Sequence, residues 1–466
     1  MSIVAAFVVP HPPLAVPGVG HGREAGIART VAAYEEVARR IALLEPETIV
    51  ISSPHTTSYL DYLHISPGRG AHGDFADFGD RADGSDVSYD TELVGEIAAG
   101  ARGAGIQAGT HGERDVDLDW GVLVPLHFIE KCYRNFKVVR MGFAGFSPLE
   151  HYRLGVEVQR AVERLGRRVV YVASGDLSHK LAQDGPYGFS PDGPVFDERV
   201  THALAQADLL SLLTMDQGLC DRAAECGLRS FQIMAGALDG TPVSSELLSY
   251  EGPYGVGYAI AALTPTGPAG SDPTRRLEDA YLEWHERQLD HARSGEDAYV
   301  RLARASLEHY VRTGSYLPLP SDLPSELTDR RAGAFVSLKK DGRLRGCIGT
   351  IAPVRPTLAD EIVENAVSAG RHDPRFSPVT ADELPELVYD VDVLGEPEPV
   401  SDRSELDPRR YGVIVSTPDG RRGLLLPNLD GVDTVDEQLS IAARKGGISL
   451  AEKDVLLERF EVVRHL

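Results

Sequence analysis

Cysteine is scarce in this chain, and the cysteines that are present follow no metal-binding or disulfide spacing. The 466 residues contain four of them, Cys132, Cys220, Cys226 and Cys347, and no CxxC pair. So few cysteines in a chain of this length do not form a disulfide framework, and the missing CxxC argues against a structural zinc site. A reducing cytoplasm is therefore the expected compartment.

Long apolar runs and an excess of basic charge are also lacking. Stretches such as VVYVA and GYAIAAL fall far short of the roughly 20 residues that a membrane span needs. The N-terminal MSIVAAFVVPHPPL has no basic segment, so we interpret it as a first strand and not as a signal peptide. The formal net charge is −23, and because nucleic acids and anionic membranes attract basic surfaces, neither is expected as a partner. Solubility alone is a sufficient reason for such acidity.

One segment has the composition of a linker between two domains. TPTGPAGSDPTRR, residues 264–276, combines Pro, Gly, Ser and Thr without apolar periodicity, which is typical of linkers. The length is compatible with about two to four domains. We predict a first domain over residues 1–263, a linker and helix over 264–294, and a second domain over 295–466.

The two sides of this segment have different patterns. Before it, strand-like runs (ETIVISS, RNFKVVRMGF, RRVVYVASG) alternate with amphipathic helical segments (REAGIARTVAAYEEVARRIALL, HYRLGVEVQRAVERLG), which predicts an α/β sheet covered by helices. After it, two helical segments precede GAFVSLKKDGRLRGCIG and STPDGRRGLLLP, both typical of hairpins because Asp-Gly suits a tight turn. VYDVDVLG alternates like a half-exposed strand. The second part is therefore predicted to be an independent α+β domain.

Three histidines each follow a strand-like run in the first part. His11 lies in FVVPHPPL, His55 in IVISSPHTT and His179 in VVYVASGDLSHKL. Side chains at the ends of buried strands open into the crevice where α/β proteins bind ligands. A lone histidine of this kind is more often structural, but three in matched contexts make a shared metal site an equal alternative. His11 and His55 are the natural pair for a site with two histidines and one carboxylate.

The carboxylate is harder to assign. Glu251, at a Gly-rich bend in SYEGPYGVGYAIAAL, is the first candidate, Glu246 the second, and Asp61 and Asp176 are weaker ones. Taken alone, Glu251 would more often be a solvated loop acid.

Four segments of the first part resemble the class III extradiol ring-cleaving dioxygenases, the LigB-type family that includes the Memo-like proteins. They are VVPHPPLAVPG, ISSPHTT, DLDWGVLVPLHF and SGDLSHKL, in this order. The resemblance implies a mixed sheet with flanking helices, Fe(II) or another divalent metal bound by His11, His55 and Glu251, and His179 as an acid–base residue. It also implies a small aromatic, catechol-type substrate cleaved with O2. Asp176 either orients His179 or caps a helix.

The sequence departs from this family at one motif. Where the family carries Asp-His-Gly, this chain has Asp119-Trp120-Gly121, so the residue that helps to position substrate or oxygen is replaced. His127 could substitute for it if the fold turned that side chain inward. The Memo-like branch also departs from a plain His-His-Glu set.

The second part resembles the AMMECR-type domain, on the motif LRGCIG at residues 344–349 and on SAGRHDPRFSPVTADEL. In prokaryotes this domain is encoded alongside Memo-like and radical-SAM proteins, which implies a radical-SAM partner. Arg345 next to Cys347 would favour a reactive thiolate, whereas the alternative is a small buried side chain in a close-packed strand. The polar run of Arg371, His372, Asp373 and Arg375 either meets this motif in space or ends a helix.

Three hypotheses follow. The first is an extradiol dioxygenase with an accessory domain, which the full set of histidines favours narrowly. The second is a Memo-like metal-binding protein that acts with a radical-SAM partner without ring cleavage, which Trp120 and the second domain favour. The third is a binding scaffold that has lost its metal. A homo-oligomer is compatible with all three.

Overall fold

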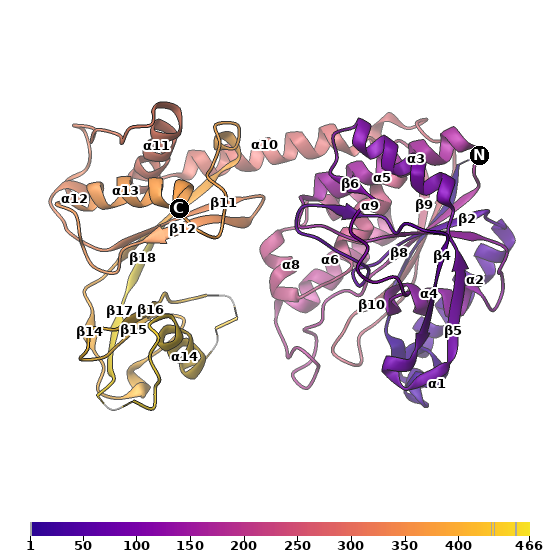
Figure 1. Ribbon diagram of the computed structural model, residues 1–466, viewed down its shortest axis with the longest axis horizontal. Helices are drawn as coiled ribbons and strands as arrows, with labels where there is room; N and C mark the ends of the chain where they lie inside the picture. The colour runs from indigo at the N-terminus through magenta and orange to yellow at the C-terminus, as the bar shows by residue number, and fades with distance from the viewer. Residues whose placement is uncertain (1, 430, 433, 453) are drawn as a thin grey trace. The chain divides into compact units, whose positions relative to one another are not determined.

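The computed structural model describes residues 2–429, 431–432, 434–452 and 454–466. The chain divides into two compact units, Met1–Trp284 and His285–Leu466 (Figure 1). The division falls within helix α10 (Leu277–Gly295), whose first turns add Leu277 and Tyr281 to the core of the first unit. Part of the stretch expected to be linker therefore belongs to a folded unit.

The first unit is built on a six-stranded mixed sheet with the order β7-β2-β8-β1-β10-β9. The first four strands are parallel, and the last two run antiparallel to their neighbours. Because β1, β2 and β8 are parallel, their carboxyl ends meet at one edge of the sheet. In sheet order the strands are β7 (Lys137–Met141), β2 (Thr48–Ser52), β8 (Val169–Ser174), β1 (Ile3–Val9), β10 (Tyr258–Pro265) and β9 (Val243–Glu251).

Helices cover both faces of this sheet, which confirms the α/β prediction. Alternate residues of β2 enter different cores: Ile49 and Ile51 pack with α2 and α4, and Val50 packs with α3, α5 and α9. This alternation follows from the period-2 geometry of a strand. The helices are α1 (Pro17–Gly20), α2 (Ala28–Leu44), α3 (Thr91–Gly103), α4 (Trp120–Ile129), α5 (Pro148–Leu165), α6 (Asp192–Gln206), α7 (Leu209–Leu213), α8 (Gln217–Ala223) and α9 (Leu228–Ala237).

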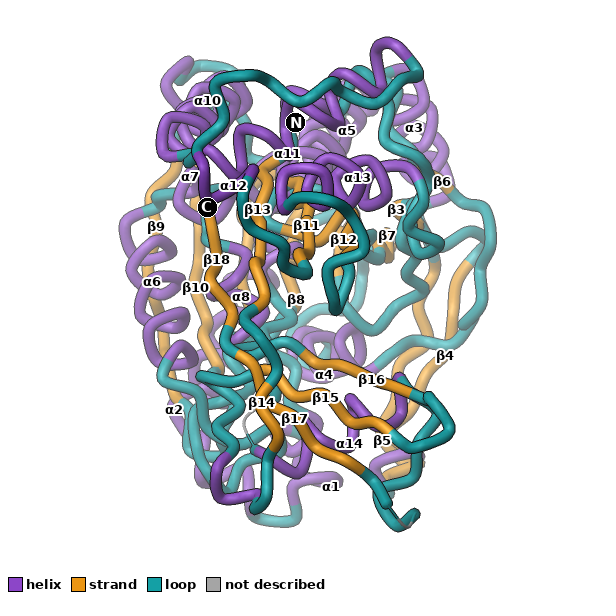
Figure 2. The backbone as a smooth tube through the Cα atoms, turned by 90° about the vertical axis from the view of Figure 1, so that its left-hand side faces the viewer, coloured by secondary structure: helices purple, strands orange, loops and turns teal. Residues whose placement is uncertain are grey.

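Two small two-stranded sheets accompany the main one. A hairpin of β4 (Gly70–Phe75) and β5 (Asp80–Ser88), which the sequence reading missed, packs against α4. The short strands β3 (Leu63–His64) and β6 (Ala108–Gly109) pair in parallel. Figure 2 shows strands in orange and helices in purple.

The second unit contains two four-stranded antiparallel sheets, as expected for an α+β domain. Helices α11 (Ala298–Thr313) and α13 (Leu358–Arg371) cover the first sheet, and α14 (Val435–Lys445) covers the second; α12 (Ser325–Thr328) is a single turn. The first sheet has the order β12 (Arg343–Gly349), β11 (Ala334–Lys340), β13 (Val388–Leu394), β18 (Val462–His465), and the second β14 (Glu398–Pro399), β17 (Leu456–Phe460), β15 (Gly412–Ser416), β16 (Arg422–Leu425).

Both hairpins predicted in the second unit are present. Asp341 and Gly342 join β11 to β12 with φ angles of 51° and 73°, the left-handed conformation that a two-residue turn requires. One expectation for this unit was wrong: β13 is not half-exposed. Asp390 and Asp392 are buried because Lys339 and Arg464 on the neighbouring strands pair with them.

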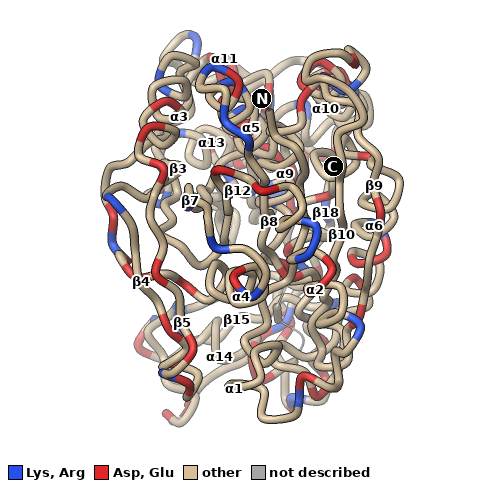
Figure 3. The backbone as a smooth tube through the Cα atoms, turned by 90° about the vertical axis from the view of Figure 1, so that its right-hand side faces the viewer, with Lys and Arg blue, Asp and Glu red and all other residues tan. Residues whose placement is uncertain are grey.

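The acidic residues are spread over helices, strands and loops and are not gathered in one segment (Figure 3). Among the described residues, none of the helices combines the length and the apolar character that crossing a membrane would require.

Candidate metal centre

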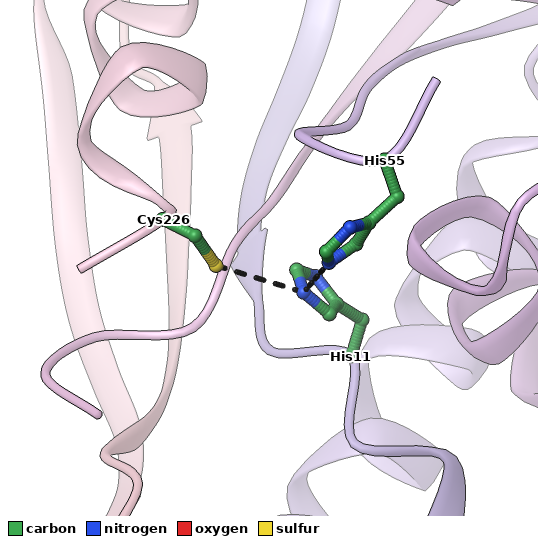
Figure 4. Close-up of side chains that lie close together, drawn as sticks. All are labelled: His11, His55 and Cys226. Atoms are coloured by element: carbon green, nitrogen blue, oxygen red, sulfur yellow. Dashed lines mark hydrogen bonds between the residues drawn. The ribbon is translucent and has the colours of Figure 1, made fainter. Parts of the chain in front are cut away.

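Two of the predicted histidines meet at the edge where β1 and β2 end. His11 lies two residues after β1, and His55 lies three residues after β2. Their Nε2 atoms are 3.0 Å apart, and their rings are nearly perpendicular (Figure 4). The convergence predicted from the strand ends is therefore present for this pair.

The hydrogen bonds of His11 indicate which of its ring nitrogens carries the proton and which carries the lone pair. Nδ1 lies 3.1 Å from the hydroxyl of Ser174, and that hydroxyl donates its single proton to the carbonyl of Gly121 at 2.5 Å. The hydroxyl can then only accept from the ring, so Nδ1 carries the proton and Nε2 carries the lone pair. Burial, followed by the charge of His179, lowers the pKa of His11 to about 3. His11 is thus a neutral imidazole whose Nε2 lone pair faces His55.

His55 is held between His11 and Trp120. The indole of Trp120 stacks on its ring with the centroids 3.8 Å apart. Burial, followed by His11, lowers the pKa of His55 to about 3, so this imidazole is neutral as well. Two lone pairs facing each other at 3.0 Å would repel, and either a proton on His55 Nε2 or a shared cation relieves that repulsion.

The third member of the cluster is Cys226, which the sequence reading did not select. It precedes α9, and its Sγ lies 3.7 Å from Nε2 of His11 (Figure 4). Ligand atoms of His11, His55 and Cys226 all lie within 4.8 Å of one another. Burial, with Asp176 and Glu225 nearby, raises the pKa of this thiol well above its usual range, so the sulfur keeps its proton unless a cation replaces it.

Glu251, the expected third ligand, lies elsewhere. Its carboxylate accepts hydrogen bonds from the backbone N–H and the hydroxyl of Thr30 at 2.8 Å, and it pairs with Arg29. Thr30 is in the first turn of α2, whose N-cap Ile27 has no capping side chain. Glu251, at the end of β9, therefore caps helix α2. Cys226 takes its place as the third member of the cluster. The second candidate, Glu246, is exposed and pairs with Arg40.

Asp176 and His179 lie in the loop after β8, beside the cluster. Asp176 accepts a 2.8 Å hydrogen bond from the backbone N–H of His11, and burial raises its pKa to about 6. It therefore fixes the loop that carries His11, a role that the sequence did not predict. Its other oxygen, Oδ2, lies 3.8 Å from His11 Nε2, so this weaker carboxylate candidate borders the cluster. The ring of His179 stacks on Tyr187 with the centroids 5.2 Å apart, and burial lowers its pKa.

His127 does not take the place of the missing motif histidine. Its Nδ1 lies 2.6 Å from a carboxylate oxygen of Asp83 on β5, and its ring packs against Phe75 and Phe128. The side chain therefore faces the β4–β5 hairpin, and the expectation of an inward-facing catalytic His127 is wrong.

The cluster fits a transition-metal ion. Nitrogen ligands about 2.1 Å and a sulfur ligand about 2.3 Å from one ion, at angles of about 90–115°, lie about 3.0–3.7 Å apart. The two spans from His11 Nε2, 3.0 Å to His55 and 3.7 Å to Cys226, match this range, and the ligand atoms of His55 and Cys226 lie within 4.8 Å of each other. Two imidazoles with one thiolate form a softer set than two imidazoles with a carboxylate, and such a set favours copper or zinc over Fe(II).

A second buried network holds the loop that carries His179. Asp197 on α6 accepts 2.8 Å hydrogen bonds from the backbone N–H of Ser178 and from the hydroxyl of Tyr250. Burial nevertheless raises the pKa of Asp197 to about 7. In an unfolded chain the same carboxyl titrates near its ordinary pKa of about 3.9.

This shift predicts a pH dependence of stability. The folded state holds the Asp197 proton more tightly, so its contribution is complete below about pH 4 and is lost as the pH rises towards about 7. Asp197→Asn cannot titrate and is expected to flatten this decline in urea unfolding curves taken between pH 4 and 8. Asp192→Asn, at the start of the same helix, serves as the control. An unchanged decline in the Asp197 variant would contradict the assignment.

In the second unit, the LRGCIG motif and the polar run after α13 do meet. Asp373 accepts from the backbone N–H of Cys347 at 2.9 Å, and Arg375 donates to the carbonyl of Cys347. Arg345, however, is bound through two nitrogens to Glu383, so its guanidinium is not directed at the thiol as expected. The hydroxyl of Ser337 donates to Cys347 Sγ at 3.2 Å.

Comparisons with known proteins agree with this division. The family model described as the catalytic LigB subunit of aromatic ring-opening dioxygenase matches residues 5–261, and the AMMECR1 model matches residues 300–465. A protein from Clostridium acetobutylicum is 42% identical over 100% of this chain and 99% of its own length. A protein from Thermotoga maritima is 55% identical over 37% of this chain and 98% of its own length. A solved structure from Pyrococcus horikoshii is 32% identical over 36% of this chain and 89% of that chain, with a TM-score of 0.34.

Proposed function

Because the chain belongs to the LigB family over residues 5–261 and carries an AMMECR1 domain over residues 300–465, we propose that its first unit is a mononuclear transition-metal centre of the Memo-like kind. His11, His55 and Cys226 would hold the ion. The observation that carries this proposal is the cluster itself, with a thiol in the place expected for a carboxylate. The radical-SAM partner implied by the resemblance belongs to the same proposal.

Trp120 also favours this function over ring cleavage. The indole covers one face of His55, and it stands where the resemblance to the ring-cleaving dioxygenases implies the histidine of an Asp-His-Gly motif. An indole N–H donates a hydrogen bond but cannot accept a proton. Trp120 can therefore shape and dry the site, but it cannot perform the acid–base work of an imidazole.

The chain's own residues supply proton handling beside the ion. Copper or iron would contribute one-electron chemistry at this place when bound, and zinc would contribute a Lewis acid. Burial lowers the pKa of His179, which favours the neutral ring, and the lone pair of a neutral imidazole can accept a proton from a bound molecule. Asp176 and Ser174 keep His11 in one orientation and one tautomer.

The metal content of the purified protein tests the proposed centre. We expect the purified protein to bind about one metal ion per chain after reconstitution, with copper or zinc retained more tightly than Fe(II), as measured by elemental analysis after dialysis. With Cu(II), a thiolate charge-transfer band should appear and should be lost in Cys226→Ser, while Cys220→Ser, at a buried position on α8, should keep it. A band that survives in Cys226→Ser would exclude the thiol as a ligand.

Ring cleavage of a catechol with O2 is the second candidate, and the family match favours it. The Fe(II) form can be mixed aerobically with a panel of catechols and followed for the yellow ring-opened product. Product formation that is lost in His11→Ala would support the dioxygenase. An iron-loaded protein that gives no product with any catechol would favour the Memo-like function.

A further inference from the structure

Asp119 occupies a helix start without capping it. It is the N-cap residue of α4, and aspartate is favoured there because its carboxylate accepts hydrogen bonds from the first backbone N–H groups. Here the side chain makes no such bond. The backbone carbonyl of Asp119 accepts from Val122 and Leu123 instead. The carboxylate is therefore not bonded to the backbone N–H groups at the start of α4.

The carboxylate is fixed on the loop that carries His55. Its Oδ1 accepts a 2.6 Å hydrogen bond from the hydroxyl of Ser53, and that hydroxyl accepts from the backbone N–H of His55 at 3.2 Å. The charge of Asp119 is close enough to act on the His55 ring. Trp120, the next residue, stacks on the same ring. Asp119 is thus anchored beside the metal cluster.

The other carboxylate oxygen, Oδ2, is buried and has no hydrogen-bond donor within the described part of the chain. A carboxyl oxygen that is buried without a hydrogen-bond partner is costly, and native proteins rarely leave one. The Asp119 carboxylate therefore does not cap its helix, and it makes a hydrogen bond through Oδ1 only. Its Oδ2 is placed to accept a hydrogen bond from a donor outside the chain.

We infer that Asp119 Oδ2 accepts a hydrogen bond from a hydroxyl group of the molecule that binds at the metal of His11, His55 and Cys226. The inference rests on the proposed metal centre and adds a substrate property to it. The ligand carries a hydroxyl donor next to the atom that reaches the metal. A ligand without that hydroxyl leaves Oδ2 without a hydrogen-bond donor and therefore binds more weakly.

A matched pair of chromogenic phenols tests this inference. 4-Nitrocatechol and its monomethyl ether 4-nitroguaiacol both offer a phenolate to the metal, but only the first has a second hydroxyl. In Asp119→Asn the amide oxygen stays with Ser53, so an NH2 group replaces Oδ2 and presents a donor where an acceptor is needed. Titrations followed by absorbance would use the metal-loaded full-length protein, with Asp117→Asn, an exposed acid of the same loop, as control.

We expect Asp119→Asn to weaken 4-nitrocatechol roughly 10–100-fold and to change 4-nitroguaiacol by no more than about twofold, since hydrogen bonds to charged groups contribute that much. Asp117→Asn should change neither. If Asp119→Asn holds its metal but weakens the binding of both phenols equally, or weakens the binding of neither, the inference is overturned and the proposed metal centre is not. A wild-type protein that binds no metal would instead overturn the proposed centre, and the inference with it.

The metal-free protein gives a second readout. Replacing a carboxylate whose buried Oδ2 has no donor should leave the melting temperature of Asp119→Asn unchanged or higher. A purely structural carboxylate would behave in the opposite way, because its loss removes needed contacts. A melting temperature several degrees below that of wild type would therefore count against a ligand-binding role.

Discussion

His11→Ala is expected to abolish metal binding by the first unit. Loss of a group that merely supports a metal ligand weakens binding roughly 10–100-fold, so loss of the central ligand should exceed that range. His11 is central because its Nε2 faces both His55, at 3.0 Å, and Cys226, at 3.7 Å. Competition with a chromogenic chelator measures the affinity.

Glu251→Gln is the informative control for that experiment. Its carboxylate holds the start of α2 through Thr30 and Arg29, so the substitution should leave metal affinity unchanged and cost about 0.5–2 kcal/mol of stability, as the loss of a helix cap does. The reverse pattern, with affinity lost in Glu251→Gln and kept in His11→Ala, would restore the carboxylate triad that the resemblance implies.

Arg140→Met should produce the largest loss of stability. Arg140 is fully buried on β7, and its guanidinium donates to the Ser66 hydroxyl, to the Glu113 carboxylate, and to the carbonyls of Asp115 and Asp117. Removing one partner of a buried ion pair leaves an uncompensated charge and typically costs about 3–5 kcal/mol. We expect a loss of this size in the urea unfolding of the first unit.

A surface pair provides the contrast. Arg153 pairs with Glu278 with both side chains 41% exposed, so Arg153→Met should cost at most about 1 kcal/mol. Equal losses in the two variants would mean that the Arg140 network contributes only as a surface ion pair does. Because the loop held by Arg140 continues into Asp119 and Trp120, the Arg140 variant should also lose metal affinity at temperatures where it remains folded.

The parts of the site that could be predicted are those fixed by local pattern. His11 and His55 follow parallel strands, and strand ends meet at one edge of a sheet, so their convergence follows from sequence periodicity. Cys226 follows no strand and reaches His11 across 215 positions of the chain. Its context, ECGLRSF, contains no spacing that indicates a ligand.

Two further expectations failed because a non-local partner decided the outcome. Glu251 has the chemistry of a ligand, but its carboxylate accepts hydrogen bonds from Thr30 at the start of α2, whose N-cap residue has no capping side chain. Asp390 and Asp392 have the alternation of a solvated strand face, but cations on β11 and β18 neutralise them in the interior. In each case the local pattern was read correctly, and the residue that satisfied the charge came from a distant segment.

The stack of Trp120 on His55 has an optical consequence. The chain contains only two tryptophans, Trp120 and Trp284, and the first lies 3.8 Å from the ring of a proposed ligand. Indole emission responds to the charge and the electronic state of whatever it touches. In a Trp284→Phe background Trp120 is the single indole of the chain, so occupancy can be followed by its emission in the intact protein without an added dye.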